Sequence, residues 1–443
     1  MITDNCQKIR GDLKCDSFSA EQWEILKKSI SHRTVEELCN NHPNLLVFPQ
    51  CRKNIDEDLG EQTICDIMDD KISTNNLVGF IGVRDADSGK HVELSIRSRF
   101  QQNGHEDFFL HYMLEKAFKV HVFNMEHGKS NDDVFDFALY LFPQYLKRAI
   151  KQGLFKQYRT REYNDANVRG VIDVTRHIRL NTPFNGRIAY HTREFQYDNS
   201  ITQLIRHTIE YIRTHKWAGN ILKQDKVMCD CVRTIYDITP SYKANDRQKV
   251  ISQNLKPIHH PYFTEYTLLQ RLCLQILRHN NIKYGVSDDK IHGILFDCAW
   301  LWEEYLATIM PQDYTHGVRS KQNGYKFYIG ESDHQRYPDF FSTNKRIVLD
   351  AKYKRVDSGI QRNDLFQIIA YMHTLPKEGA LVGGLIYPSE TSQEPTARTL
   401  NGYNGKLLTL PLKIPRSNNY ATFRDEMNRN SRVLVEKLNT LLK

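Results

Sequence analysis

The chain contains 443 residues, of which 40% are hydrophobic and 26% are charged. This composition is typical of a folded globular protein, and the length predicts two or three domains. Lys and Arg number 61 against 53 for Asp and Glu, and the net charge of +8 suits a nucleic-acid ligand without requiring one. No apolar run approaches the roughly 20 residues that cross a membrane, and the first residues lack the apolar core of a signal peptide. We therefore expect a cytoplasmic protein with no membrane partner.

Nine cysteines lie at irregular spacings along the chain. An odd number without a regular framework predicts free thiols in a reducing compartment. Cys229 and Cys231 lie close together, but no second pair follows them at zinc-finger spacing. The sequence therefore predicts neither a disulfide framework nor a zinc site at this pair.

Residues 1–75 are predicted to form a mainly helical extension. Ser19 followed by Gln22, and Thr34 followed by Glu37, are capping-box patterns that each open a helix. No motif in this extension indicates a function.

Residues 76–128 are predicted to form a small α+β unit. Apolar runs at 77–83 and 92–96 are typical of strands, and the polar residues 85–89 between them predict a turn. A helical pattern follows from about residue 107 to 117. No residue of this unit is a catalytic candidate.

Residues 129–285 are predicted to form a mainly helical middle region. Clustered basic residues with Tyr158 and Tyr163 among them could follow a phosphate backbone, but a solvated helix face with nearby loop charges explains them equally well. Both interpretations stay open. The basic residues are Lys147, Arg148, Lys151, Lys156, Arg159, Arg161 and Arg169.

A cluster of opposite charges is predicted near the C-terminal end of the chain. Asp339 follows Pro338, and Asp350 and Lys352 follow the buried-strand pattern at 347–349. Side chains alternate across a strand, so Asp350 and Lys352 project from the same face. Carboxylates can hold Mg²⁺ against a scissile phosphate, and a Lys can orient water and stabilise developing negative charge. A surface hairpin with a cross-strand ion pair would give the same pattern.

The segments around this hairpin have helical patterns. Gln367 and Tyr371 lie four residues apart, on one side of a helix predicted from residue 364 to 375. Glu303 and Glu304 interrupt an apolar helical pattern at 295–310. We favour Glu303 as the inward acid because apolar residues surround it at helical spacing, and the choice between the two stays open.

The spacing of Asp339, Asp350 and Lys352 resembles the PD-(D/E)xK nuclease motif. Gln367 and Tyr371 are similar to the QxxxY signature of its RecB-like branch. The resemblance implies that Asp339 and Asp350 coordinate one or two Mg²⁺ ions and that Lys352 acts on the attacking water. It further implies a metal ligand from the Ala351 carbonyl, a metal-facing acid at Glu303, and positioning roles for Gln367 and Tyr371.

The middle of the chain resembles the McrC family, the nuclease subunit of McrBC-type restriction systems, and also LlaJI-type subunits. The similar blocks include Val168-Arg169-Gly170 and the nuclease motif, and the resemblance covers residues 76–443. One departure is Tyr337, which separates Arg336 from the Pro-Asp pair. The resemblance implies docking, through the N-terminal half that includes residues 76–128, onto an McrB-like AAA+ GTPase ring that translocates double-stranded DNA.

The sequence agrees that this chain binds no nucleotide, because no GxxxxGK[ST] phosphate loop is present. We therefore predict an α/β protein in which residues 286–443 form a PD-(D/E)xK endonuclease domain with a mixed central sheet. The predicted function is Mg²⁺-dependent DNA cleavage within a restriction complex. Two alternatives are a non-catalytic adaptor between DNA and the motor, and a stand-alone RecB-type repair nuclease.

Overall fold

The structure is a computed structural model, and its residues form two compact units. The first unit combines residues 1–137 with 289–443, and the second spans 138–288. Each is described separately below. The described residues are 2–13, 18–42, 44–49, 57–85, 88–102, 107–118, 137–215, 218–223, 225–258, 260–282, 291–317, 325–326, 335–342, 344–356, 359–374, 381–402 and 404–442.

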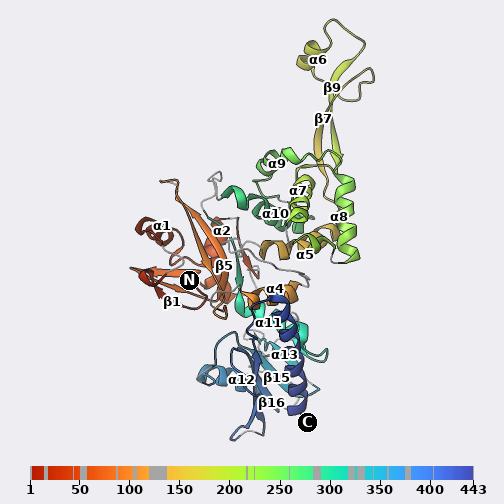
Figure 1. Cartoon of the computed structure of the whole chain (residues 1–443). Coiled ribbons are helices and arrows are strands. Elements are labelled where there is room, and N and C mark those ends of the chain that lie inside the picture. Colours follow the sequence, from red (N-terminus) through yellow and green to blue (C-terminus); the bar gives the residue numbers. More distant parts are fainter. Residues whose placement is uncertain are drawn as a thin grey trace. The chain divides into compact units, whose positions relative to one another are not determined.

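The N-terminal part of the first unit contains two sheets (Figure 1). The smaller has the order β1-β4-β3, with β1 at Gln7–Ile9, β4 at Lys71–Thr74 and β3 at Cys65–Met68. The larger has the order β2-β10-β5-β6, with β2 at Leu45–Phe48, β10 at Ile291–Asp297, β5 at Leu77–Arg84 and β6 at His91–Ile96. The 3-10 turn η1 (Arg10–Asp12) and helices α1 (Ala20–Ile30), α2 (Val35–Asn41) and α3 (Glu57–Glu61) accompany these strands.

The mainly helical segment expected at residues 1–75 contains helices α1 to α3 but also four short strands. The predicted helix starts are present, since Ser19 forms a capping box with Gln22 and Thr34 accepts a hydrogen bond from the Glu37 amide. However, the same segment supplies β1 to β4. These strands are only three or four residues long, too short to show a clear alternation of apolar and polar residues.

The larger sheet joins three segments that the sequence separates. Strand β2 runs parallel to β10, and β5 pairs antiparallel with both β10 and β6. The predicted strands at 77–83 and 92–96 are therefore confirmed, and the helix expected at 107–117 is α4 (Phe108–Phe118). The four-domain division stays a prediction, although segments 1–75, 76–128 and 286–443 all contribute to this sheet.

Gly79 of β5 and Gly293 of β10 allow these two strands to approach closely. Gly79 has a φ of +134°, and a Cβ atom placed on it would lie 2.1 Å from the Ile294 carbonyl oxygen.

We expect Gly79→Ala to lower the free energy of unfolding by at least about 2 kcal/mol, because a backbone atom cannot move aside without disturbing the sheet. Chemical denaturation checks this. Gly11→Ala is the matched control, since its Cβ would meet nothing within 4 Å, and an equal loss in both variants would contradict the prediction.

The C-terminal part of the first unit contains a mixed six-stranded sheet of order β11-β14-β15-β16-β18-β17. Pairs β15/β16 and β16/β18 are parallel, and the other pairs are antiparallel. The strands are β11 (Thr315–His316), β14 (Phe340–Ser342), β15 (Ile347–Ala351), β16 (Val382–Ser389), β17 (Thr396–Thr399) and β18 (Lys406–Lys413). A separate pair joins β12 (Tyr325–Lys326) to β13 (Gln335–Arg336).

Helices cover both faces of this sheet, so the α/β prediction is confirmed. Figure 1 shows α12 (Arg362–Thr374) and α13 (Tyr420–Leu441) on opposite sides of the strands. Helix α11 (Cys298–Ile309) packs against α13, α4 and β15. The helix expected at 295–310 begins later than predicted, because residues 295–297 end strand β10 and the Asp297 side chain caps α11. Residue 375, the last of the helix predicted from residue 364, lies outside the described part.

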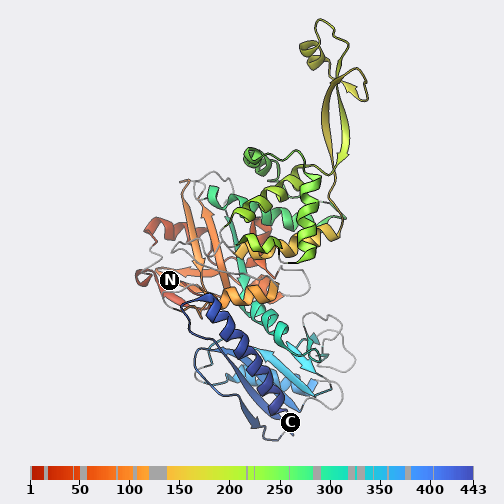
Figure 2. The ribbon, with the colours of Figure 1, turned by 45° about the vertical axis from the view of Figure 1, so that its right-hand side comes forward.

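The second unit is a helical bundle that carries a long hairpin (Figure 2). Its helices are α5 (Phe137–Lys151), α7 (Ser200–Thr214), α8 (Lys226–Ile238), α9 (Arg247–Gln253) and α10 (Thr264–Ile282), with 3-10 turns η3 (Ala218–Lys223) and η4 (Ala244–Asp246). Residues 132–136, where the helical pattern was expected to start, lie outside the described part. The hairpin pairs β7 (Gln157–Asp165) with β9 (Ile188–Gln196), and its tip holds β8 (Val171–Ile172) and α6 (Val174–Leu180).

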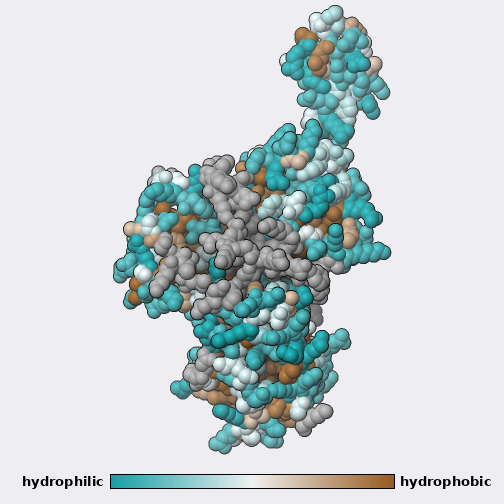
Figure 3. Space-filling view, viewed as in Figure 1, coloured by the Kyte–Doolittle hydropathy of each residue, from teal (hydrophilic) through white to brown (hydrophobic). Residues whose placement is uncertain are grey.

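The tip of this hairpin exposes apolar side chains, which gather around α6 in Figure 3. Six large apolar residues here are at least 46% exposed: Val171, Ile172, Val174, Ile178, Leu180 and Phe184. Isolated exposed apolar residues are common, but a group of this kind marks an interaction surface. No described helix is both long and apolar enough to span a membrane.

Candidate active site

Strands β14 and β15 bring two carboxylates together. Asp339 directly precedes β14, and Asp350 lies in β15, where it is 2% exposed. The strands pair antiparallel with Phe340 opposite Leu349. The Ala351 amide donates a 2.6 Å hydrogen bond to Asp339 Oδ2. Asp339, just before β14, is thus fixed beside the end of β15, where Asp350 lies.

Lys352 connects these acids to helix α12. Its Nζ lies 2.7 Å from Asp350 Oδ2 and donates a 2.8 Å hydrogen bond to Gln367 Oε1. Gln367 Nε2 in turn donates to the Tyr371 hydroxyl at 3.0 Å. This chain of contacts holds the ammonium group in one orientation, and Tyr371 acts on it only through Gln367.

A pocket of about 360 Å³ contains most of the predicted site residues. Glu303 enters it from α11, whereas Glu304 is not among the described residues that line it. The pocket's described lining consists of Asn5, Asn76, Arg99, Ala299, Glu303, Asp339, Asp350, Ala351, Lys352, Tyr353, Lys354 and Gln367. Three carboxylates and three cationic side chains therefore share one small space.

Burial raises the pKa of each carboxyl in this pocket, and charges of nearby acids add to the shift. The pKa of Asp339 lies well above its usual range, first because the group is buried and then because Asp350 is near. Burial is also the main cause of the raised pKa of Glu303 and of Asp350, and Lys352 opposes the shift at Asp350. The positive charge of Lys352 is therefore not enough to bring the pKa values of these acids back to their usual range.

The pKa of Lys352 is raised above its ordinary value of 10.5. Burial works to lower it, but the charge and the hydrogen bond of Asp350 outweigh burial. Lys352 is therefore an ammonium ion at neutral pH, and it can donate hydrogen bonds but cannot accept a proton.

The oxygen donors in this pocket suit a hard divalent cation such as Mg²⁺. Among the described residues, no group of three His, Cys, Asp or Glu side chains is arranged to coordinate a metal ion. Mg²⁺ does not need such a cage, because it is usually held by one or two carboxylates together with water and substrate phosphates. Asp339, Asp350 and the Ala351 carbonyl fit that pattern, with Glu303 within the same pocket.

A family model described as "McrBC 5-methylcytosine restriction system component" matches residues 72–388. The chain belongs to this McrBC family. The matched segment includes every predicted site residue, from Glu303 to Tyr371, and the family resemblance inferred from the sequence is confirmed.

Two solved structures from Thermococcus gammatolerans are similar to this McrBC-family chain. One is a refined half-complex from a tetradecameric assembly of McrB AAA+ hexamers with bound McrC. Its matching chain has 17% sequence identity and a TM-score of 0.47, and the match covers 97% of this chain and 99% of that chain. The other is a cryo-EM structure of the McrBC complex, with 16% identity, a TM-score of 0.32, and coverage of 70% and 87% respectively. The curated proteins include no match.

Three residues of the pocket lie outside the motifs that the sequence indicated. Asn5, Asn76 and Arg99 come from the N-terminal part of the McrBC-family chain. They are more than 200 residues from Asp339 in sequence, and Asn5 precedes the segment that the family model matches. No local pattern marks them, because their proximity to the acids depends on long-range packing.

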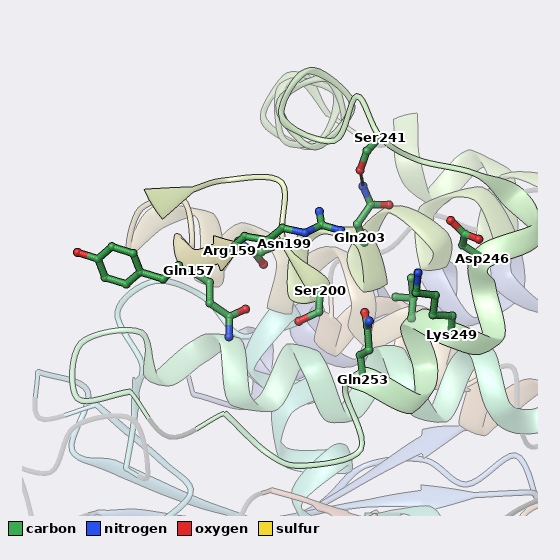
Figure 4. A pocket seen from close by; sticks show the side chains of 11 residues that line it. Gln157, Arg159, Asn199, Ser200, Gln203, Ser241, Asp246, Lys249 and Gln253 are labelled. Carbon is green, nitrogen blue, oxygen red and sulfur yellow. Dashed lines mark hydrogen bonds between the residues drawn. The ribbon is translucent and has the colours of Figure 1, made fainter. Parts of the chain in front are cut away.

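A second pocket, of about 280 Å³, lies in the second unit between β7, α7 and α9 (Figure 4). Most of its lining residues have polar side chains, and Gln203 donates a 3.1 Å hydrogen bond to Ser241 across it. Among the described lining residues Asp246 is the single carboxylate. No predicted site residue lies there, and the pocket has no pair of acids for metal binding.

Proposed function

We propose that this McrBC-family chain is the Mg²⁺-dependent DNA endonuclease subunit of a restriction complex, with a PD-(D/E)xK site. One observation carries the proposal. Asp339, Asp350, Lys352 and Gln367 line one pocket, in which the Ala351 amide holds Asp339 and Lys352 joins Asp350 to Gln367. Acids that hold a cation and an amine that faces them are the groups that phosphodiester hydrolysis requires.

In the proposed site, Asp339, Asp350 and the Ala351 carbonyl hold Mg²⁺, and Glu303 is the additional acid. A bound Mg²⁺ ion would polarise the scissile phosphate and lower the pKa of an attacking water. Lys352 donates hydrogen bonds to that water or to a phosphoryl oxygen and stabilises the negative charge that develops. Gln367 keeps Lys352 in place, and Tyr371 keeps Gln367 in place.

The proposed partners are double-stranded DNA and an McrB-like AAA+ GTPase ring. The sequence contains no GxxxxGK[ST] motif, which favours a partner protein as the source of nucleotide-derived energy. The exposed apolar tip of the β7–β9 hairpin supports a docking role for the second unit, since such a surface is normally covered by a partner.

A cleavage assay with the purified chain tests the proposal. We expect double-stranded DNA to be cut when Mg²⁺, GTP and the AAA+ GTPase partner are all present, and EDTA to stop the reaction. Cleavage without partner or GTP would instead support a stand-alone repair nuclease. Stable DNA and partner binding with no cleavage under any of these conditions would support the adaptor.

A further inference from the structure

We propose that Arg99 binds a backbone phosphate of the DNA strand that enters the acid pocket, as a positioning residue for the proposed cleavage. The inference rests on the proposed nuclease function and assigns a role to the N-terminal part of the first unit. Arg99 follows strand β6 and lines the pocket together with Glu303, Asp339 and Asp350.

Arg99 is held rigidly before any ligand arrives. Its Nε donates a 2.7 Å hydrogen bond to Asp4 Oδ2, and its Nη2 donates to Asn76 Oδ1 at 2.6 Å and also pairs with Asp4. The Arg99 backbone amide donates to Asp4 Oδ1. The Tyr353 ring centroid lies 5.2 Å from the guanidinium carbon. A guanidinium fixed in this way loses little conformational entropy when it binds a ligand.

The contacts of Arg99 leave donors available for a ligand. Asp4 is fully buried and occupies Nε and Nη2, whereas the Arg99 side chain keeps 11% of its surface exposed. Among the described residues, Nη1 has no hydrogen-bond partner. Arg99 lines the pocket, and a planar guanidinium matches the oxygens of a phosphate.

The charge of the pocket also favours a phosphate at Arg99. Glu303, Asp339 and Asp350 would repel a DNA strand, and Lys352 is already paired with Asp350. Lys354 is paired with Asp364. Asp4, the acid that pairs with Arg99, is buried and is not among the described residues that line the pocket, whereas Arg99 lines it. Asn5 and Asn76 supply amide groups beside it.

A purely structural role for Arg99 would be to tie residues 2–13 to the turn after β6 through Asp4. That role affects stability, whereas phosphate binding also affects the salt dependence of DNA affinity and the KM for DNA. The double variant Asp4→Asn/Arg99→Gln removes both charges and keeps polar groups at both positions, so that no buried charge is left unpaired. Arg99→Lys keeps the positive charge but replaces the planar guanidinium and its paired N–H donors with a single ammonium group.

The test measures DNA affinity of the full chain in Ca²⁺ at several salt concentrations, and cleavage kinetics in Mg²⁺ with the partner and GTP. We expect the double variant to bind DNA about tenfold more weakly, with a slope of log affinity against log salt that is smaller by about 0.9, the value for one lost phosphate contact. KM should rise about tenfold while kcat changes by less than about threefold. Arg99→Lys should show an intermediate affinity.

The matched control is Asp70→Asn/Arg10→Gln, which removes another Asp–Arg pair of the N-terminal part, outside the pocket. It should leave the slope and KM unchanged. The proposal is overturned if the Asp4/Arg99 variant has a normal slope of log affinity against log salt and a normal KM. This holds even if its melting temperature or its kcat has changed. Absence of cleavage by the unmodified chain would count against the nuclease function instead, because the affinity slope is measured without cleavage.

Discussion

Asp350→Asn is expected to reduce DNA cleavage by the reconstituted complex by at least about 10³-fold. Asp350 is the acid that contacts Lys352 and shares the pocket with Asp339 and Glu303. An amide of the same shape supplies no negative charge to hold a divalent cation. The measurement is the rate of double-strand cleavage at saturating Mg²⁺ and GTP.

The same substitution should leave the fold intact. Burial already disfavours the charged form of Asp350, as its raised pKa indicates, but Asp350→Asn leaves Lys352 without its ion-pair partner. We expect the free energy of unfolding at neutral pH to fall by no more than about 3 kcal/mol, which leaves the chain folded. Asp313→Asn is the control, because Asp313 pairs with Lys345 at 2.8 Å outside the pocket, and it should cleave normally. Normal cleavage by Asp350→Asn would contradict the assignment.

Lys352→Met is expected to reduce the cleavage rate by about 10²- to 10³-fold, the usual effect of removing one donor that stabilises transition-state charge. Mg²⁺ affinity should not fall, because the substitution removes a positive charge from beside Asp350. Gln367 would lose its hydrogen-bond donor partner but keep its contact with Tyr371. Single-turnover kinetics separate this effect on the chemical step from any effect on DNA binding.

The pH dependence of the unmodified chain gives an independent check on Lys352. Its folded pKa is raised, so the ammonium form persists up to its ordinary value of 10.5 and is lost only as the pH rises through the higher folded value. In the chain without Mg²⁺, the ¹⁵N NMR signal of the Lys352 ammonium group should therefore show no deprotonation between pH 7 and about 10. Lys345→Met, which removes an amine outside the pocket, should retain the full rate. A substitution at Lys352 that spares the rate would exclude it from the chemical step.

The sequence predicted the central elements of the site because their signals are local. The β14–β15 hairpin follows from an apolar run with polar turn residues, and helix α12 follows from its apolar spacing. The alternation of side chains along a strand placed Asp350 and Lys352 on one face, and the structure has their charged groups 2.7 Å apart. The inward orientation predicted for Glu303 agrees with its position in the pocket.

The elements that the sequence did not predict depend on distant partners. Strand β2 becomes a strand only by pairing with β10, which lies about 240 residues later. In the β7–β9 hairpin Ala189 and Tyr190 of β9 are buried, but the first six residues of β7 are all exposed, so no alternation of apolar residues marks it. Arg99 enters the pocket because Asp4, Asn76 and Tyr353 hold it there, and no spacing rule relates these positions.

Locating a bound cation tests the central claim most directly. Mn²⁺ prefers the same oxygen ligands as Mg²⁺, and its anomalous scattering in crystals of this chain would mark its position. We predict a Mn²⁺ peak coordinated by the carboxylates of Asp339 and Asp350, and its disappearance in Asp350→Asn. A fully bound Mn²⁺ ion elsewhere, with both carboxylates free of metal, would contradict the assignment of this pocket as a nuclease site.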